Sequence, residues 1–283
     1  MVGTTEHFID VGSFQWFYRK AEPINPSDKP PVICLHGLPS QSYSWRHVLS
    51  ALSDQGFVAI APDWLGLGFS DKPDKRMFAY TPDAYLEALA DFLEALKISR
   101  FSLVVQGFLG SVGLQYASRH ADQIERLVII NTPVSTAAKL PWKIRQLGIP
   151  LVGEMLTQDP LLVDRTLEGG GPYQIDDDDL DVYRRPFLKS SDAGRALFVL
   201  VRRLQLQQAM ADVQNGFANW TQPTLVVWGT ADPWLPLSMA EDFAKALPDS
   251  ELVRLDEVGH YAQEDWHEKV SANLTTFLRR KML

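Results

Sequence analysis

The stretch SLVVQGFLGSVGLQYA, residues 102–117, decides the fold. It begins as an apolar run that ends at Gln106-Gly107, and from Phe108 onward apolar residues recur at helical intervals. A short apolar run followed at once by helical periodicity predicts a buried strand, a sharp turn and a helix. The predicted strand thus meets the turn at Gly107.

Predicted strands alternate with predicted helices on both sides of this stretch. A hairpin is predicted over 6–10 and 14–19, and apolar strands follow at 32–35, 57–61, 101–105, 127–130, 224–228 and 252–255. Continuous apolar strands that alternate with helices are typical of a parallel sheet covered on both faces. The sequence therefore predicts an α/β fold with a mostly parallel sheet.

The alternation stops at Thr132-Pro133 and resumes at Pro223. We expect a core domain of residues 1–132 and 223–283, with residues 133–222 forming an inserted helical cap. The run Gly169-Gly170-Gly171 is interpreted as a joint within this cap. The acidic run 176–179 lacks the alternating ligand spacing of a calcium loop, so we interpret it as the first turn of a helix and predict no metal site.

Composition limits the partners and the compartment. A formal charge of -8 and a pI near 5.3 disfavour an electrostatic nucleic-acid binder, and a small apolar molecule is the expected partner. The single cysteine, Cys34, lies in an apolar run, which predicts a buried thiol and a reducing compartment. No apolar segment approaches the ~18 residues of a membrane span. We expect the cytoplasm, or the plastid stroma if a transit peptide has been removed; no cofactor is predicted, and the oligomeric state stays open.

Five motifs together resemble the α/β-hydrolase superfamily, and within it the haloalkane dehalogenase and epoxide hydrolase branch. They are Leu35-His36-Gly37-Leu38-Pro39, the segment 60–73, the turn 106–110, the segment 228–236, and Val258-Gly259-His260. The resemblance covers essentially the whole chain and implies the α/β-hydrolase fold with an inserted cap. The sequence Gln106-Gly107-Phe108 also resembles the corresponding turn in a cyanobacterial and plastid subgroup of this superfamily.

The resemblance implies roles for several residues. Asp232 and His260 match the catalytic acid and base, and the N–H groups of Leu38 and Phe108 match the oxyanion hole. Two such preorganised donors are worth roughly 10²- to 10³-fold each where a negative oxygen develops. Beyond these, the candidate pocket residues are Gln106, Trp142 and Phe187.

The sequence departs from the dehalogenase pattern at the nucleophile. That pattern reads Gln-Asp-Trp-Gly-Gly, whereas this chain has Gly107 and Phe108 in place of the carboxylate and the tryptophan, and Leu38 where Asn or Glu often stands. Loss of a nucleophile typically costs ~10⁶ in turnover. Haloalkane dehalogenation and epoxide hydrolysis through an ester intermediate are therefore disfavoured. Ser111 lies one turn farther on and is expected to face helix packing.

Two functions from different classes fit these residues. In the first, His260 and Asp232 activate a water or abstract a proton from a small hydrophobic carbonyl or ester-type substrate, giving water-mediated hydrolysis or lyase-like chemistry. In the second, the chain is a catalytically inactive relative that binds a small apolar ligand or a protein partner. The retained Asp232 and His260 favour the enzyme, and the missing nucleophile favours the binding protein.

Overall fold

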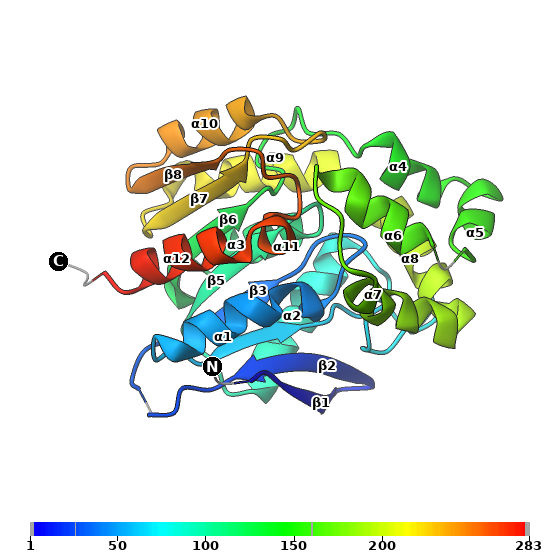
Figure 1. Ribbon diagram of the computed structural model, residues 1–283, viewed down its shortest axis with the longest axis horizontal. Helices are drawn as coiled ribbons and strands as arrows, with labels where there is room; N and C mark the ends of the chain where they lie inside the picture. Colours follow the sequence, from blue (N-terminus) through cyan, green and yellow to red (C-terminus); the bar gives the residue numbers. More distant parts are fainter. Residues whose placement is uncertain (1–2, 26, 160, 281–283) are drawn as a thin grey trace.

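The chain folds around one eight-stranded sheet (Figure 1). The computed structural model describes residues 3–25, 27–159 and 161–280. The strand order is β1-β2-β4-β3-β5-β6-β7-β8. β1 and β2 form an antiparallel hairpin, β2 pairs antiparallel with β4, and every other pair is parallel. The strands are β1 (Thr5–Val11), β2 (Phe14–Ala21), β3 (Val32–Leu35), β4 (Ala59–Pro62), β5 (Phe101–Gln106), β6 (Ile124–Ile130), β7 (Thr224–Gly229) and β8 (Ser250–Leu255).

Helices cover both faces of this sheet, as the continuous apolar strands predict. α1 (Arg46–Asp54) and α12 (His267–Leu278) lie on one face, while α2 (Pro82–Ala95) and α3 (Gly110–Arg119) lie on the other (Figure 1). Along β5, Val104 belongs to the core on the first face, and Leu103 and Val105 belong to the core on the second. Cys34 is buried in β3, as predicted. Burial on both faces fixes the carboxyl ends of the parallel strands relative to one another.

The segment between β6 and β7 contains helices and, in the ranges described, no strand. Its helices are α4 (Trp142–Arg145), α5 (Val152–Leu156), α6 (Leu162–Leu167), α7 (Asp177–Lys189), α8 (Ser191–Arg203) and α9 (Leu206–Gly216). α4 to α8 lie beyond one end of the sheet (Figure 1). α9 instead packs along α3, so the predicted cap range 133–222 includes one helix of the layer that covers the sheet. α10 (Leu237–Ala246) connects β7 with β8.

A partly buried ionic cluster fastens α7 to the core. Arg46 of α1 bonds Asp179 at 2.5 Å and Glu264 of α11 (Ala262–Asp265) at 2.8 Å. Tyr43 donates to Asp179 at 2.7 Å, and Tyr183 of α7 donates to Glu264. Burial raises the pKa of Glu264 although Arg46 opposes the shift. The acidic run thus supplies the first turn of α7, as predicted, and one of its members also fixes the cap.

No group of three or more potential ligands in the described ranges is placed to hold a metal ion. Nor does this part of the chain contain a helix long and apolar enough to cross a membrane.

Removing Glu264 tests the contribution of this cluster. Glu264→Ala leaves Arg46 largely buried without its main partner, and we expect it to lower the free energy of unfolding by about 3–5 kcal/mol. Glu268→Ala, at an exposed ion pair on the neighbouring helix, should change it by less than about 1 kcal/mol. Equilibrium urea unfolding of the two variants measures both values. Equal values would show that the cluster adds no more than a surface pair.

Candidate active site

The turn after β5 depends on two glycines. Gly107 has φ +69°, in the left-handed region that side chains rarely adopt. Gly37, in the loop after β3, packs directly against it: a Cβ at Gly37 would lie 3.0 Å from the Cα of Gly107 and 2.7 Å from Oε1 of Gln106. The strand, turn and helix predicted from the sequence are therefore present, and the β3 loop touches the turn.

Asp232 and His260 meet beside Gly107. Asp232 follows β7, His260 follows β8, and Nδ1 of His260 lies 2.8 Å from Oδ2 of Asp232, with both side chains fully buried. We assign the ring proton to Nδ1, because the carboxylate is an acceptor. Nε2 then carries a lone pair and has no hydrogen-bond partner in the described chain. It lies 3.3 Å from the position that a Cβ of residue 107 would occupy.

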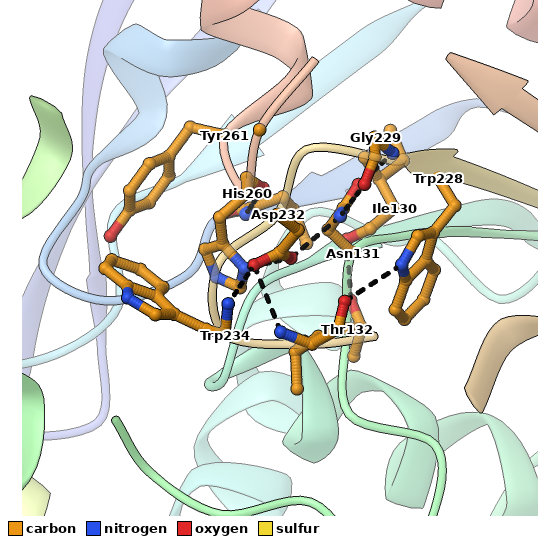
Figure 2. A network of polar contacts seen from close by, with 12 residues as sticks. Ile130, Asn131, Thr132, Trp228, Gly229, Asp232, Trp234, His260 and Tyr261 are labelled. Atoms are coloured by element: carbon orange, nitrogen blue, oxygen red, sulfur yellow. Dashed lines mark hydrogen bonds and ion pairs between the residues drawn. The ribbon is translucent and has the colours of Figure 1, made fainter. Parts of the chain in front are cut away.

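The carboxylate of Asp232 is fixed by three donors. Oδ1 accepts from the backbone N–H groups of Trp234 at 2.8 Å and Leu235 at 3.1 Å, and Oδ2 accepts from Nδ2 of Asn131 at 2.8 Å. Asn131 follows β6, and its own Oδ1 accepts from the N–H of Gly229 at 2.8 Å (Figure 2). These bonds hold the carboxylate in one orientation beside the imidazole. Asn131 was not among the predicted site residues, although a polar residue directly after an apolar strand is a usable signal.

The N–H of Leu38 lies at the turn as the resemblance implies. Its nitrogen is 3.8 Å from the Cβ position of residue 107, and the N–H of Phe108 is the next along the chain from Gly107. Neither N–H donates a hydrogen bond to another residue in the described ranges. Tyr261 fixes the loop by donating its hydroxyl to the carbonyl of Leu38 at 2.5 Å.

Aromatic rings surround the imidazole of His260. Phe108 stacks on it at 5.2 Å between ring centroids, Trp234 lies at 4.7 Å, and Tyr261 meets it edge to face at 5.0 Å. Figure 2 shows Trp234 and Tyr261 beside the dyad. In such an apolar enclosure, electrostatic interactions are stronger than in water. The lone pair of Nε2 therefore points into a space enclosed by aromatic rings that exclude bulk solvent.

The other predicted site residues occupy different places. Gln106 is buried, and its Nε2 donates to the backbone carbonyl of His260 at 2.8 Å. Phe187 lines a small cavity between α7 and the loop that begins at Pro39. Trp142 is 59% exposed and its ring contacts Arg145, so its contacts do not support a role as a pocket wall. Ser111 donates to the carbonyl of Phe108 at 2.8 Å and faces helix packing, as expected.

A strand–turn–helix elbow with an Asp–His pair after the following strands defines an α/β-hydrolase type of site. The family model of the alpha/beta hydrolase fold matches residues 30–159 and 182–265, and the chain belongs to this family. The relatives place it in the haloalkane dehalogenase-like branch, as the sequence resemblance implies.

Two relatives and one solved structure represent the similarity. The chain is 30% identical over 279 residues to the cis-3-alkyl-4-alkyloxetan-2-one decarboxylase of Xanthomonas campestris pv. campestris, covering 91% of each chain. It is 26% identical over 269 residues to haloalkane dehalogenase 2 of Mycobacterium tuberculosis, covering 91% of this chain and 92% of that protein. The structure of haloalkane dehalogenase DbeA from Bradyrhizobium elkani superposes with a TM-score of 0.84 at 25% identity, covering 97% of each chain.

Asn131→Ala tests the support of the dyad. The change removes one donor to Asp232 and leaves the buried N–H of Gly229 unpaired, so we expect a loss of about 1–3 kcal/mol in the free energy of unfolding. Urea unfolding measures this loss, with Asn273→Ala in the exposed part of α12 as the control. An Asn131→Ala variant as stable as the control would contradict the proposed support.

Asp265 makes the loop of His260 sensitive to pH. Its Oδ2 accepts the N–H of Gly259 at 2.6 Å, and burial raises the pKa of the carboxyl to about 6 from 3.8. A raised pKa in the folded state means that this group stabilises the fold below about pH 4, and that the contribution is lost as the pH rises through 6.

Asp265→Asn isolates this contribution because the amide stays neutral and still offers an acceptor to Gly259. Relative to wild type, we expect the variant to gain roughly 2–3 kcal/mol of stability between pH 4 and pH 7. Unfolding in urea at pH 4, 5.5 and 7 gives the difference at each point, with Asp256→Asn as an exposed control. A difference that does not change with pH would disprove the assignment.

Proposed function

We propose that this chain is an enzyme that acts on a small apolar carbonyl compound of the ester or lactone type without forming a covalent intermediate. One observation carries the proposal. Nε2 of His260, whose ring is held by Asp232, is directed at Gly107 instead of a nucleophilic side chain, and no residue in the described part of the chain hydrogen-bonds to it. A base with this geometry acts on a molecule that enters the site.

Hydrolysis needs only a water at this lone pair. Nε2 takes a proton from the water as its oxygen attacks the carbonyl carbon, and the carbonyl electron pair moves onto oxygen. The N–H groups of Leu38 and Phe108 would bind that oxyanion, and Asp232 would stabilise the imidazolium. Collapse of the intermediate expels the alkoxide, which takes the proton back from Nε2. General-base catalysis contributes about 10²- to 10⁴-fold and each oxyanion donor about 10²- to 10³-fold.

A second candidate reaction is fragmentation of a β-lactone. The name of the Xanthomonas relative describes loss of CO₂ from a four-membered lactone. That reaction converts the ring into CO₂ and an alkene and consumes no water. The atoms of the lactone account for both products, so no attacking carboxylate is needed to balance the reaction. The identity of 30% over 91% of both chains favours this candidate. Halide displacement by a carboxylate is not proposed, because glycine stands at position 107.

Paired variants test the proposal on a panel of p-nitrophenyl esters and β-lactones. His260→Ala should lower kcat/KM by at least about 100-fold, because the base is removed. Gly107→Ala should lower it by at least about tenfold, because its methyl group would lie 3.3 Å from Nε2 and take the position of the attacking water. His267→Ala, at a histidine on α12 away from the dyad, should retain the wild-type rate.

Two outcomes would contradict the enzyme. In one, His260→Ala turns over the panel as fast as wild type. In the other, wild type turns over none of these compounds but binds an apolar fluorescent probe tightly, a result that would support the ligand-binding alternative.

A further inference from the structure

The backbone of His260 is held by two different parts of the molecule. Its N–H donates to the carbonyl of Gly170 at 2.7 Å, in the cap between α6 and α7. Its carbonyl accepts from Nε2 of Gln106 at 2.8 Å, at the end of β5. The peptide groups on either side of the imidazole therefore connect the cap to the elbow.

The cap reaches this backbone through a contact between glycines. A Cβ at Gly259 would lie 2.4 Å from the carbonyl oxygen of Gly170 and 2.4 Å from the Cα of Gly171. Both are backbone atoms, which cannot rotate away as a side chain does. A Cβ at Gly171 would in turn lie 3.1 Å from the Cα of Gly259 and 2.7 Å from Oδ2 of Asp265. None of these three glycines has a positive φ, so the close approach, and not the backbone conformation, requires glycine.

Gly169 differs from its two neighbours in the same run. The atoms near its Cβ position all belong to the side chain of Lys143, the nearest being Nζ at 2.5 Å, and this flexible end can move aside. A Cβ at Gly170, by contrast, would lie 2.7 Å from the buried ring of Tyr261 and 3.3 Å from Cβ of His260. The run interpreted from sequence as a joint thus has two members that contact the loop of the base and one that does not.

We propose that the cap positions the base: Gly170 and Gly171 hold His260 in place only while the cap is docked on the loop 259–261. These glycines are positioning residues: Gly170 contacts His260 itself, and Gly171 contacts Gly259, the residue before it. Movement of the cap to admit a ligand breaks the hydrogen bond from His260 to Gly170 and releases one of the two backbone anchors of the base. The base is therefore held by both anchors only while the cap is docked on the loop. This inference rests on the proposed function insofar as His260 is the catalytic base.

Hydrogen exchange in the wild-type protein tests the coupling without any substitution. A segment that opens as one cooperative unit gives a common opening free energy for its amides. We expect the opening free energy measured at the His260 amide to equal that of the amides of α6 and α7. If the opening free energy at the His260 amide instead equals that of the β5 amides, the proposal is overturned, because the base would then stay anchored when the cap opens.

Gly171→Ala with Gly169→Ala as its matched control tests the contact itself. The first places a methyl group against Gly259 and Asp265, and the second places one against a movable lysine. We expect the His260 amide to exchange about tenfold faster in Gly171→Ala than in wild type, since a buried hydrogen bond is weakened, and within about twofold of wild type in Gly169→Ala. Equal exchange in the two variants would overturn the proposal.

Activity gives a separate measurement on the same variants. Gly171→Ala should lower kcat with little change in KM, because the base is displaced while the walls that bind substrate remain. A larger change in KM than in kcat would contradict a positioning role. If the chain turns over no substrate, the proposed function fails, whereas the exchange comparison still decides whether the cap holds His260.

Discussion

The site depends on the hydrogen bond between Nδ1 of His260 and Oδ2 of Asp232, made at full burial. A buried carboxylate is costly unless its oxygens are paired, and here Trp234, Leu235 and Asn131 supply the donors. Asn131 directly follows β6, and Trp234 and Leu235 lie in the loop after β7, so the pair forms only because these parallel strands end side by side. The geometry of the Asp232–His260 pair is thus a consequence of the sheet.

Glycine is the second requirement of the site. Gly37 allows the β3 loop to touch the elbow, Gly107 adopts a left-handed turn, and Gly259 allows the cap to touch the loop of His260. At each position a methyl group would meet an atom at 3.0 Å or less. Position 107 differs from the others because its glycine also determines what chemistry is possible there. With no side chain at that position, Nε2 of His260 faces the backbone of the turn and whatever molecule enters.

The features that follow from local sequence could be predicted. Apolar runs predicted the strands and their burial, and the motifs around Leu38, Asp232 and His260 placed these residues after the carboxyl ends of parallel strands, here β3, β7 and β8. The acidic run was correctly interpreted as the first turn of a helix. Each of these depends on residues close together in the chain.

The features that depend on distant contacts could not be predicted. Asn131 and Gly170 act through segments about a hundred residues away, and nothing in their local sequence names the partner. Trp142 was expected to line the pocket, but in a four-residue helix periodicity does not determine which side faces inward, and its side chain is largely exposed. Likewise, the sequence pattern of α9 is that of a helix in either the cap or the layer over the sheet. Only its contact with α3 assigns it to the layer over the sheet.

In the proposed mechanism, His260 acts directly on a molecule beside Gly107 with no covalent intermediate. Intact-protein mass spectrometry of enzyme quenched during a single turnover of an activated ester or β-lactone tests it most directly. We expect product to form while the protein keeps its unmodified mass at every time point. A transient species heavier by the mass of the acyl or alkyl group, formed and lost at the rate of turnover, would contradict it.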